Sequence, residues 1–446
     1  MLRAVHCSRE IAVTYTAIGS PTTTLTDAEL GSHLETALHR LGPRRKVIAV
    51  PPDMSRLHSR AGRITGMAWR HYGDALRAVL PAIGTHFPMS DRELEEMYPG
   101  VPRELFRVHN WQADLATLGR VPGAVVREVS EGRLDFDWPA QLNSALVDDG
   151  YDLILSIGQV VPHEVTGMAN YNKNIFIGTG GREGIHKSHY LGAVCDMERI
   201  MGRIDTPVRR VLNYASERFA ADLPIVYILT VIGRDDTGEL VLRGLFIGDN
   251  EDCFRKAARL SRQVNVTTVA EPLDTVVVYL DPAEYRSTWI GNKAVYRSRM
   301  ALADGGRLIV LAPGVHTFGE DGEIDAHIRA HGYRGTDYVT ELVKGELEGV
   351  AGAGGLGLAD NLAAAAHLIH GSSEGRFSIT YCAGGLTQEE IEGVGYDYAD
   401  VSAMSKRYLP ANRRIGMHTT DDGETYYFIA NPGLGLWGTA ERLGGH

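Results

Sequence analysis

"YDLILSIGQVV" (residues 151–161) is an almost unbroken apolar run, and the polar segment "PHEVTGMANYNKN" (162–174) follows it directly. Such a run is typical of a strand buried on both faces, as in a parallel sheet covered by helices. Further strands are predicted at "RKVIAV" (45–50), "LFRVHNW" (105–111) and "PIVYILTVI" (224–232). Helices are predicted between them at "TDAELGSHLETALHRL" (26–41), "MAWRHYGDALRAVL" (67–80) and "SDRELEEMY" (90–98), the first and last opening with capping boxes. This alternation indicates an α/β fold with a mainly parallel sheet.

The chain has 446 residues, which is too long for one ordinary core and predicts at least two domains. A second series of strands begins after residue 265, at "DTVVVYLD" (274–281), "GRLIVLAPGV" (306–315) and "RFSITYCAGG" (376–385). We therefore expect two α/β domains with mainly parallel sheets, 1–265 and 266–446, and an active-site cleft between them. The second domain is expected to close the cleft, and its last residues to pack back on the first.

Composition excludes several classes of protein. The net charge of −11 argues against a nucleic-acid or anionic-membrane binder. The four cysteines are scattered, with no C-x-x-C pair, which fits a reducing compartment. The first residues lack a signal-peptide pattern and no apolar run reaches membrane-spanning length, so a cytoplasmic protein is expected.

Polar residues recur where the predicted strands end. In open α/β sheets, ligands bind beyond the carboxyl ends of the strands. Several separate segments that each place polar groups there predict one shared cleft. The residues concerned are Asp53, Arg56, Thr85, His86, His109 and His163.

Each of these residues also has a structural interpretation. Asp53 can cap the following turn, and His109 or His163 can be satisfied interior histidines. Lys173 and His189 lie in polar segments where a solvated surface position is the usual outcome. The prediction therefore depends on the set of residues together.

The spacing of three residues resembles that of the lactate racemase family. The family has a P-H-x-x-x-G segment, a lysine ten residues after its histidine and a second histidine sixteen residues later, matched here by His163, Lys173 and His189. Its D-x-x-R loop resembles "DMSR" (53–56), its G-T-H loop resembles "GTHFPMS" (84–90), and its V-H-[DN] context resembles "RVHN" (107–110). A downstream "KA" segment with a following glycine pair and strand resembles "NKAVYRSRMALADGGRLIVLAPG" (292–314).

The resemblance implies a covalently attached cofactor. In the family, a lysine carries a nickel-pincer nucleotide (pyridinium-3-thioamide-5-thiocarboxylic acid mononucleotide) through a thioamide, and a histidine completes the square plane around nickel. Lys173 would be the attachment point and His189 the nickel ligand, a donor set suited to nickel(II). Asp53, Arg56, Thr85 and His86 are expected to bind the cofactor, and cofactor-biosynthesis enzymes are expected partners.

The resemblance also implies an isomerase. Family members transfer a hydride from C2 of a 2-hydroxy acid to the cofactor and return it to the other face. The hydroxyl needs a base on each side, and histidine suits this role because its pKa lies near neutrality. His109 and His163 are the expected acid–base pair of a racemase or epimerase. Arg56 and Lys293 are expected to bind the substrate carboxylate or the cofactor phosphate.

Departures from the family leave the substrate open. Ile290, beside Trp289, replaces the glutamine of lactate-specific members, and both residues are expected to contact substrate. Asn170, Tyr171 and Asn172 replace small residues near the cofactor. The added amides and hydroxyl favour a sugar acid such as an aldonate, whereas Trp289 and Ile290 would suit an aryl or alkyl 2-hydroxy acid, and lactate stays among the alternatives.

Two other functions compete with this interpretation. One is a hydrolase or lyase with a protein-bound zinc held by His163, His186 and His189. The other is a non-catalytic cofactor carrier, which would need neither histidine base. The expected assembly includes a homodimer.

Overall fold

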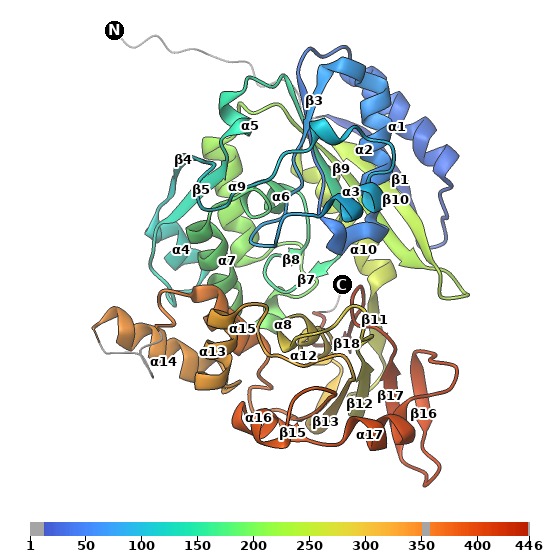
Figure 1. Cartoon of the computed structure of the whole chain (residues 1–446), viewed down its shortest axis with the longest axis vertical. Coiled ribbons are helices and arrows are strands. Elements are labelled where there is room, and N and C mark those ends of the chain that lie inside the picture. Colours follow the sequence, from blue (N-terminus) through green and yellow to red (C-terminus); the bar gives the residue numbers. More distant parts are fainter. Residues whose placement is uncertain (1–12, 350–356, 445–446) are drawn as a thin grey trace.

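The computed structural model describes residues 13–349 and 357–444, which form two lobes, each built around a six-stranded sheet (Figure 1). Both sheets are mixed but mainly parallel, which confirms the predicted α/β fold class. No helix among the described residues is long and apolar enough to cross a membrane.

The first sheet is parallel at one side and antiparallel at the other. Strands β3, β2, β6 and β9 are parallel neighbours, whereas β10 and β1 continue the sheet in antiparallel pairs. All seven residues of β6 are buried, as the apolar run predicts. In sheet order, the strands are β1 (Thr14–Gly19), β10 (Leu240–Gly248), β9 (Ile225–Arg234), β6 (Leu153–Gln159), β2 (Val47–Val50) and β3 (Leu76–Val79).

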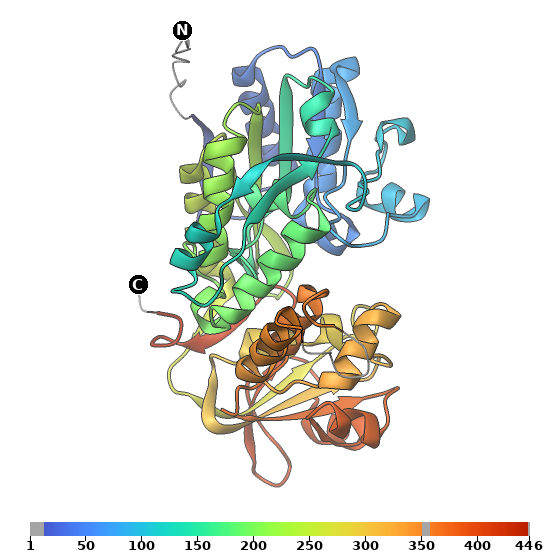
Figure 2. The ribbon, with the colours of Figure 1, turned by 90° about the vertical axis from the view of Figure 1, so that its left-hand side faces the viewer.

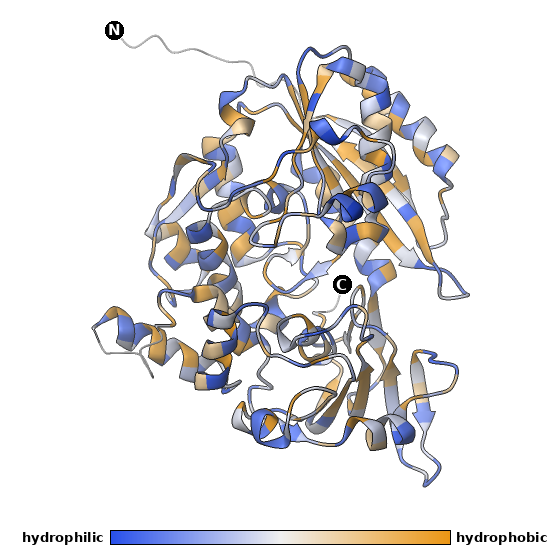
Figure 3. Ribbon diagram, viewed as in Figure 1, coloured by the Kyte–Doolittle hydropathy of each residue, from blue (hydrophilic) through white to orange (hydrophobic). Residues whose placement is uncertain are grey.

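Helices cover both faces of this sheet. Val47 and Ala49 pack against α1 and α2 on one face, whereas Ile48 and Val50 join a core that includes α7, α9 and α10 on the other. Figure 3 shows the hydrophobic residues concentrated in the sheet strands. The helices of this lobe are α1 (Asp27–Leu41), α2 (Ala61–Tyr72), α3 (Asp91–Met97), α4 (Gly123–Val129), α5 (Ala145–Asp148), α6 (Asn172–Phe176), α7 (Arg182–Val194), α8 (Met197–Ile200), α9 (Pro207–Phe219) and α10 (Glu251–Asn265).

Shorter elements complete the first lobe, and two sequence predictions need correction there. The segment 67–80 is not one helix, because α2 ends at Tyr72, a short 3-10 turn η2 (Gly73–Ala75) follows, and β3 begins at Leu76. Residues 105–111 form no strand but a loop after η3 (Arg103–Leu105), with an isolated bridge between Val79 and Phe106. The remaining elements are η1 (Met54–Ser59), β4 (Leu115–Val121), β5 (Trp138–Asn143), β7 (Pro162–His163) and β8 (Gly167–Met168).

The second sheet is parallel except for its last strand, β16, which pairs antiparallel with β17. In sheet order, its strands are β15 (Asp397–Tyr398), β14 (Ser378–Ala383), β13 (Leu302–Ala312), β12 (Leu273–Tyr279), β17 (Thr425–Ile429) and β16 (Gly416–Thr419). The helices around it are α11 (Thr288–Gly291), α12 (Lys293–Ser298), α13 (Gly322–His331), α14 (Thr336–Leu347), α15 (Leu362–His370), α16 (Gln388–Gly393) and α17 (Val401–Tyr408).

Several contacts join the lobes. Strand β11 (Val266–Val269), which follows α10 directly, pairs in parallel with β18 (Leu436–Thr439), so the C-terminal segment lies at the junction of the lobes (Figure 2). The buried guanidinium of Arg297 donates hydrogen bonds to the carbonyls of Pro162 (3.0 Å) and Gly435 (2.9 Å). Helix α15 also packs along α7. The expected domain boundary near residue 265 falls between α10 and β11.

Candidate active site

A cavity of about 290 Å³ lies between the lobes and collects polar groups from both. From the first lobe it is lined by the predicted site residues Asp53, Arg56, Thr85, His86, His163, Lys173 and His189. From the second lobe it is lined by Trp289, Ile290 and Lys293. Residues that are far apart in the sequence therefore meet at one place, beyond the carboxyl ends of β2, β3 and β6, as expected for a parallel sheet.

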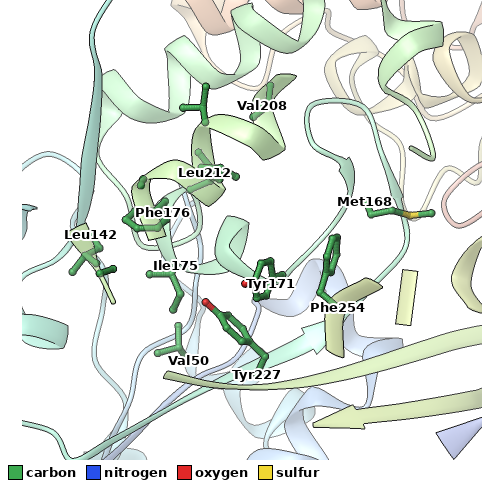
Figure 4. Packing of buried hydrophobic residues seen from close by; sticks show 14 of the residues in the cluster. Val50, Leu142, Met168, Tyr171, Ile175, Phe176, Val208, Leu212, Tyr227 and Phe254 are labelled. Atoms are coloured by element: carbon green, nitrogen blue, oxygen red, sulfur yellow. The ribbon is translucent and has the colours of Figure 1, made fainter. Parts of the chain in front are cut away.

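A strained turn places Lys173 in this cavity. Asn170 and Tyr171 both have positive φ angles, 65° and 59°, which is unusual for residues other than glycine. The ring of Tyr171 stacks on Phe254 and packs against Tyr227, with centroid distances of 5.1 and 4.4 Å (Figure 4). These contacts hold a turn that an isolated chain would rarely adopt.

Arg209 also stabilises this turn. Its guanidinium is fully buried and donates to the carbonyls of Met168 (2.6 Å) and Asn170 (3.2 Å) and to the side chain of Asn172. The backbone before Lys173 is therefore fixed by hydrogen bonds on one side and by aromatic rings on the other.

The amine of Lys173 is easier to deprotonate than that of an ordinary lysine. Burial, followed by the nearby positive charge of Arg56, lowers its pKa to about 8. A lysine desolvated in this way carries a substantial fraction of neutral, nucleophilic amine near neutral pH. Lys173 is thus suited to covalent attachment.

His189 presents one free ring nitrogen. Its Nδ1 lies 2.7 Å from the carbonyl of Ile185, one turn earlier in α7, and must donate a proton to it. Burial lowers the pKa of His189, which favours the neutral ring. Its Nε2 has no hydrogen-bond partner in the described part of the chain and keeps its lone pair, the state in which histidine binds a metal.

His86 and Asp53 form a close pair at the mouth of the cavity. Nδ1 of His86 lies 2.6 Å from Oδ2 of Asp53, and the other carboxylate oxygen, Oδ1, accepts hydrogen bonds from the backbone N–H and the hydroxyl of Ser55. Burial, the largest single influence, acts to raise the pKa of Asp53, but the hydrogen bond and charge interaction with His86, the hydrogen bond from Ser55 and the charge of Arg56 together lower it. Asp53 therefore caps η1 and orients His86 at the same time.

His163 precedes Lys173 in the sequence, and its tautomer is the opposite of that of His86 and His189. Its Nδ1 accepts a hydrogen bond from the backbone N–H of Val165 (3.1 Å), so Nε2 carries the proton of the neutral ring. Burial holds the pKa of His163 well below its usual value, although the adjacent Glu164 acts to raise it. The Glu164 carboxylate is 3.9 Å from Nδ1.

Positive charge comes from both lobes. Arg56 follows β2, and Lys293 begins α12 in the second lobe. Burial and then the charge of Arg56 lower the pKa of Lys293 to about 8. An anionic carboxylate or phosphate between these two side chains would relieve their mutual repulsion.

The structure does not bring His109 to the cavity. This buried ring is held between the carbonyl of Gly180, 3.0 Å from its Nε2, and the side-chain amide of Asn143, 3.0 Å from its Nδ1. Its expected catalytic role is therefore not supported by its position, because residues 105–111 form a loop instead of a strand that ends at the cleft.

The zinc alternative also lacks a ligand set. His186 does not line the cavity that holds His163 and His189. Within residues 13–349 and 357–444, no three or more His, Cys, Asp or Glu side chains cluster as metal ligands.

Several polar residues that line the cavity were not predicted from the sequence. Asn170 was expected near the cofactor, but Glu164 was given no role, and Gln159, His367 and His370 were missed. Their helical spacing could have indicated a shared position, because Ala363, Ala366, His367 and His370 lie on one face of α15.

Comparison with known proteins identifies the fold. No protein-family model and no curated protein matches this chain. A crystal structure of a protein from Thermotoga maritima matches with a TM-score of 0.76 and 24% identity, covering 94% of this chain and 99% of that one. The lactate racemase apoprotein from Thermoanaerobacterium thermosaccharolyticum matches with a TM-score of 0.68 and 15% identity, covering 93% of each chain. The fold, two mainly parallel mixed sheets in an α/β protein, is therefore like that of lactate racemase.

Proposed function

We propose that this protein is a racemase or epimerase of 2-hydroxy acids that uses a nickel-pincer nucleotide. One observation carries the proposal: a partly buried, easily deprotonated lysine shares a cavity with a histidine whose tautomer suits metal binding and with the histidines His86 and His163. The fold likeness to a lactate racemase apoprotein supports it independently.

The residues present fit this cofactor. Lys173 would carry it through its amine, and Nε2 of His189 would bind the nickel. Arg56 and Lys293 provide positive charge for a phosphate or for the substrate carboxylate, with the arginine able to bind two oxygens at once. When bound, the cofactor supplies the acceptor and donor of a hydride at C2 of the substrate.

The proton transfers belong to the protein. His86 has a proton-free Nε2, because its Nδ1 donates to Asp53, and can take the proton of the substrate hydroxyl. His163 has its proton on Nε2 and can donate a hydrogen bond from this atom to the substrate oxygen. A racemase needs an acid–base group for each enantiomer. We assign one of these roles to His86 in place of His109. His163 can act as the base for the other enantiomer once its proton moves from Nε2 to Nδ1, which gives up the hydrogen bond from Val165.

The inner end of the site is shielded from solvent, whereas its mouth is open. His163 and Asn170 are each 6% exposed and Lys173 is partly buried, but the side chain of His86 is 63% exposed. Shielding at the inner end strengthens the interactions of the developing oxyanion with Arg56 and Lys293.

The decisive test is mass spectrometry of the peptide that contains Lys173, from protein co-expressed with the cofactor-synthesis enzymes and nickel. The expected result is a heavy, sulfur-containing adduct on Lys173 that is lost in Lys173→Ala and retained in the control Lys256→Ala, a surface lysine paired with Asp252. An unmodified Lys173, alongside a lactate racemase that is loaded under the same conditions, would overturn the proposal. Loaded protein that isomerises no 2-hydroxy acid would indicate the cofactor carrier instead.

A further inference from the structure

The peptide that joins Asn170 to Tyr171 has an unusual conformation for residues with side chains. The φ angles of the two residues are 65° and 59°, and ψ of Tyr171 is −136°, a combination that glycine adopts far more readily than tyrosine. Lys173 follows as the second residue of α6, a helix of only five residues. Because so short a helix is not stable by itself, the position of Lys173 at the cavity depends on what holds this peptide.

Arg209 of α9 holds the peptide through its carbonyl group. One terminal nitrogen of the guanidinium, Nη1, donates to the carbonyl of Asn170 (3.2 Å) and to the side chain of Asn172. The other, Nη2, donates to the carbonyl of Met168 (2.6 Å). The carbonyl of Asn170 belongs to the peptide between the two residues with positive φ. Its hydrogen bond therefore opposes rotation of that peptide toward an ordinary conformation.

The guanidinium of Arg209 is buried without a carboxylate partner. Within residues 13–349 and 357–444 it forms no ion pair, and Glu251, an acid whose charge acts on it, is paired with Arg255 (2.9 Å). A buried, unpaired charge is costly and persists where hydrogen bonds replace the lost water. Here the carbonyls before Lys173 replace it, and the ring of Phe254 lies 4.5 Å from the guanidinium carbon. This arrangement indicates that the arginine is needed to bind those carbonyls.

Two further residues of α9 bind the same turn. Nδ2 of Asn172 donates to Oδ1 of Asn213 (2.7 Å) and to the hydroxyl of Ser216 (3.2 Å), while Oδ1 of Asn172 accepts from Arg209. Residues 209, 213 and 216 are four and three positions apart and therefore share one face of α9. One face of this helix thus binds the residues that lead directly to Lys173.

We infer that Arg209 is a positioning residue for Lys173: by holding the Asn170–Tyr171 peptide in its strained orientation, it presents the amine of Lys173 to the cavity. Arg209 does not line the cavity, so it acts through the turn and not by contact with a ligand. The use of the presented amine for cofactor attachment rests on the proposed function, whereas the position of the amine can be measured without a cofactor.

The first test is the pH dependence of Lys173 acetylation in unloaded Arg209→Lys, followed by quantitative mass spectrometry. Burial and then Arg56 lower the pKa of Lys173 to about 8, and the charge of Arg209 acts in the same direction. Lysine keeps that charge but lacks the planar fork that binds several carbonyls at once. We expect the midpoint to move up from near pH 8 toward about 10.4, because a relaxed turn exposes the amine to water. A midpoint that stays near pH 8 in the folded variant would overturn the inference.

Arg243→Lys is the matched control. Arg243 is also buried, and its guanidinium donates to the carbonyls of Thr23 (2.8 Å) and Arg234 (2.7 Å), away from the cavity. This variant is expected to lose stability and to keep the midpoint of Lys173. A midpoint that moves as far as in Arg209→Lys would overturn the inference, because the shift would then follow from any weakened fold.

Asn213→Ala provides the test if Arg209→Lys does not fold, which circular dichroism will show. This half-buried residue can be truncated with less disturbance, and the change removes its hydrogen bond to Asn172. We expect the midpoint of Lys173 to move upward by a smaller amount than in Arg209→Lys. An unchanged midpoint in folded Asn213→Ala would then overturn the inference.

Two substitutions of Tyr171 separate positioning of the turn from general support of the fold. Tyr171→Ala and Tyr171→Gly both remove the ring that stacks on Phe254, but only alanine keeps the Cβ that makes a positive φ costly. The shift caused by Arg209→Lys is expected to be large when added to Tyr171→Ala and clearly smaller when added to Tyr171→Gly. Equal shifts in both would show that Arg209 does not act on the strained peptide and would overturn the inference.

Loading with the cofactor separates this inference from the proposed function. In protein co-expressed with the cofactor-synthesis enzymes and nickel, Arg209→Lys is expected to lower the fraction of Lys173 that carries the adduct about tenfold. Absence of the adduct from the unsubstituted protein would overturn the proposed function, while the acetylation curves would still decide the role of Arg209. A fraction equal to that of the unsubstituted protein would overturn the role of Arg209 and leave the proposed function in place.

Discussion

Nδ1 of His86 lies 2.6 Å from Oδ2 of Asp53, although the residues are 33 positions apart in the chain. The hydrogen bond joins the loops that follow β2 and β3, two neighbouring parallel strands. It fixes the tautomer of an imidazole whose side chain is otherwise largely exposed, at 63%. This relationship makes His86, and not His109, the histidine with a controlled basic nitrogen at the cavity.

Replacing His86 by alanine is expected to lower kcat of the loaded enzyme about 1,000-fold, because it removes a general acid–base group. His109→Ala removes contacts with Gly180 and Asn143 instead, and is expected to lower the free energy of unfolding by about 1–3 kcal/mol while kcat per folded, loaded molecule changes little. Initial rates and thermal unfolding, measured for both variants, check these two predictions. A loss of kcat in His109→Ala as large as in His86→Ala would contradict it.

Asp53→Asn is expected to change how stability depends on pH. The pKa of Asp53 is lowered in the folded protein, so its ionised form contributes stability at pH values above the ordinary carboxyl pKa of about 3.9. That contribution is lost as the pH falls from there through the lowered pKa of the folded state. Urea unfolding should therefore show the variant to be less stable at pH 7 and the difference to shrink in acid. A difference that grows below pH 4 would contradict this linkage.

Lys173 is expected to react with small amine reagents at an unusually low pH. Its pKa is lowered to about 8, and only the neutral amine is nucleophilic, so acetylation should rise with pH and reach half of its maximum near pH 8. The matched control is the same lysine in urea-unfolded protein, where the midpoint should lie near about 10.4. Quantitative mass spectrometry of unloaded protein measures both curves. Coincident curves would show that burial does not activate the amine.

Gly158→Ala is expected to disturb the turn that carries Lys173. A Cβ at this position would lie 2.2 Å from Nδ2 of Asn170, the first of the two residues with positive φ. We expect a loss of roughly 2 kcal/mol in the free energy of unfolding and a lower fraction of loaded Lys173. Gly322→Ala is the control, because a Cβ there meets no atom within 4 Å. Equal stability of the two variants would argue against a tightly packed turn.

Local signals predicted much of the fold. The capping boxes at Thr26 and Ser90 are present, because each depends only on residues three positions apart. The apolar run that begins at Tyr151 contains β6 (Leu153–Gln159), whose residues are buried on both faces. Segment 67–80 was misassigned because its apolar spacing suits a helix throughout, whereas Gly73 ends α2 and the last residues pair with β2.

The site was less accessible to sequence reasoning. The segments that follow β2, β3 and β6 were expected to share one cleft, and residues from all three line the same cavity, although the segment that contains β3 was predicted as a helix. Which histidine turns toward the cavity depends on tertiary contacts that have no local signal, as His86 and His109 illustrate. His367 and His370 were missed because the stretch before them is dominated by glycine and alanine. Their position at the cavity follows only from the packing of α15 on α7, which has no local sequence signal.

The hydrogen bonds of Arg297 to Pro162 and Gly435 have a consequence for the order of events during synthesis. The ribosome produces Lys173 early, whereas the walls around it also require α12 and α15 of the second lobe. A nascent chain that has just exposed Lys173 lacks its partners from the second lobe. We therefore expect the enzymes that install a cofactor on this lysine to recognise a completed and folded surface and not an emerging peptide.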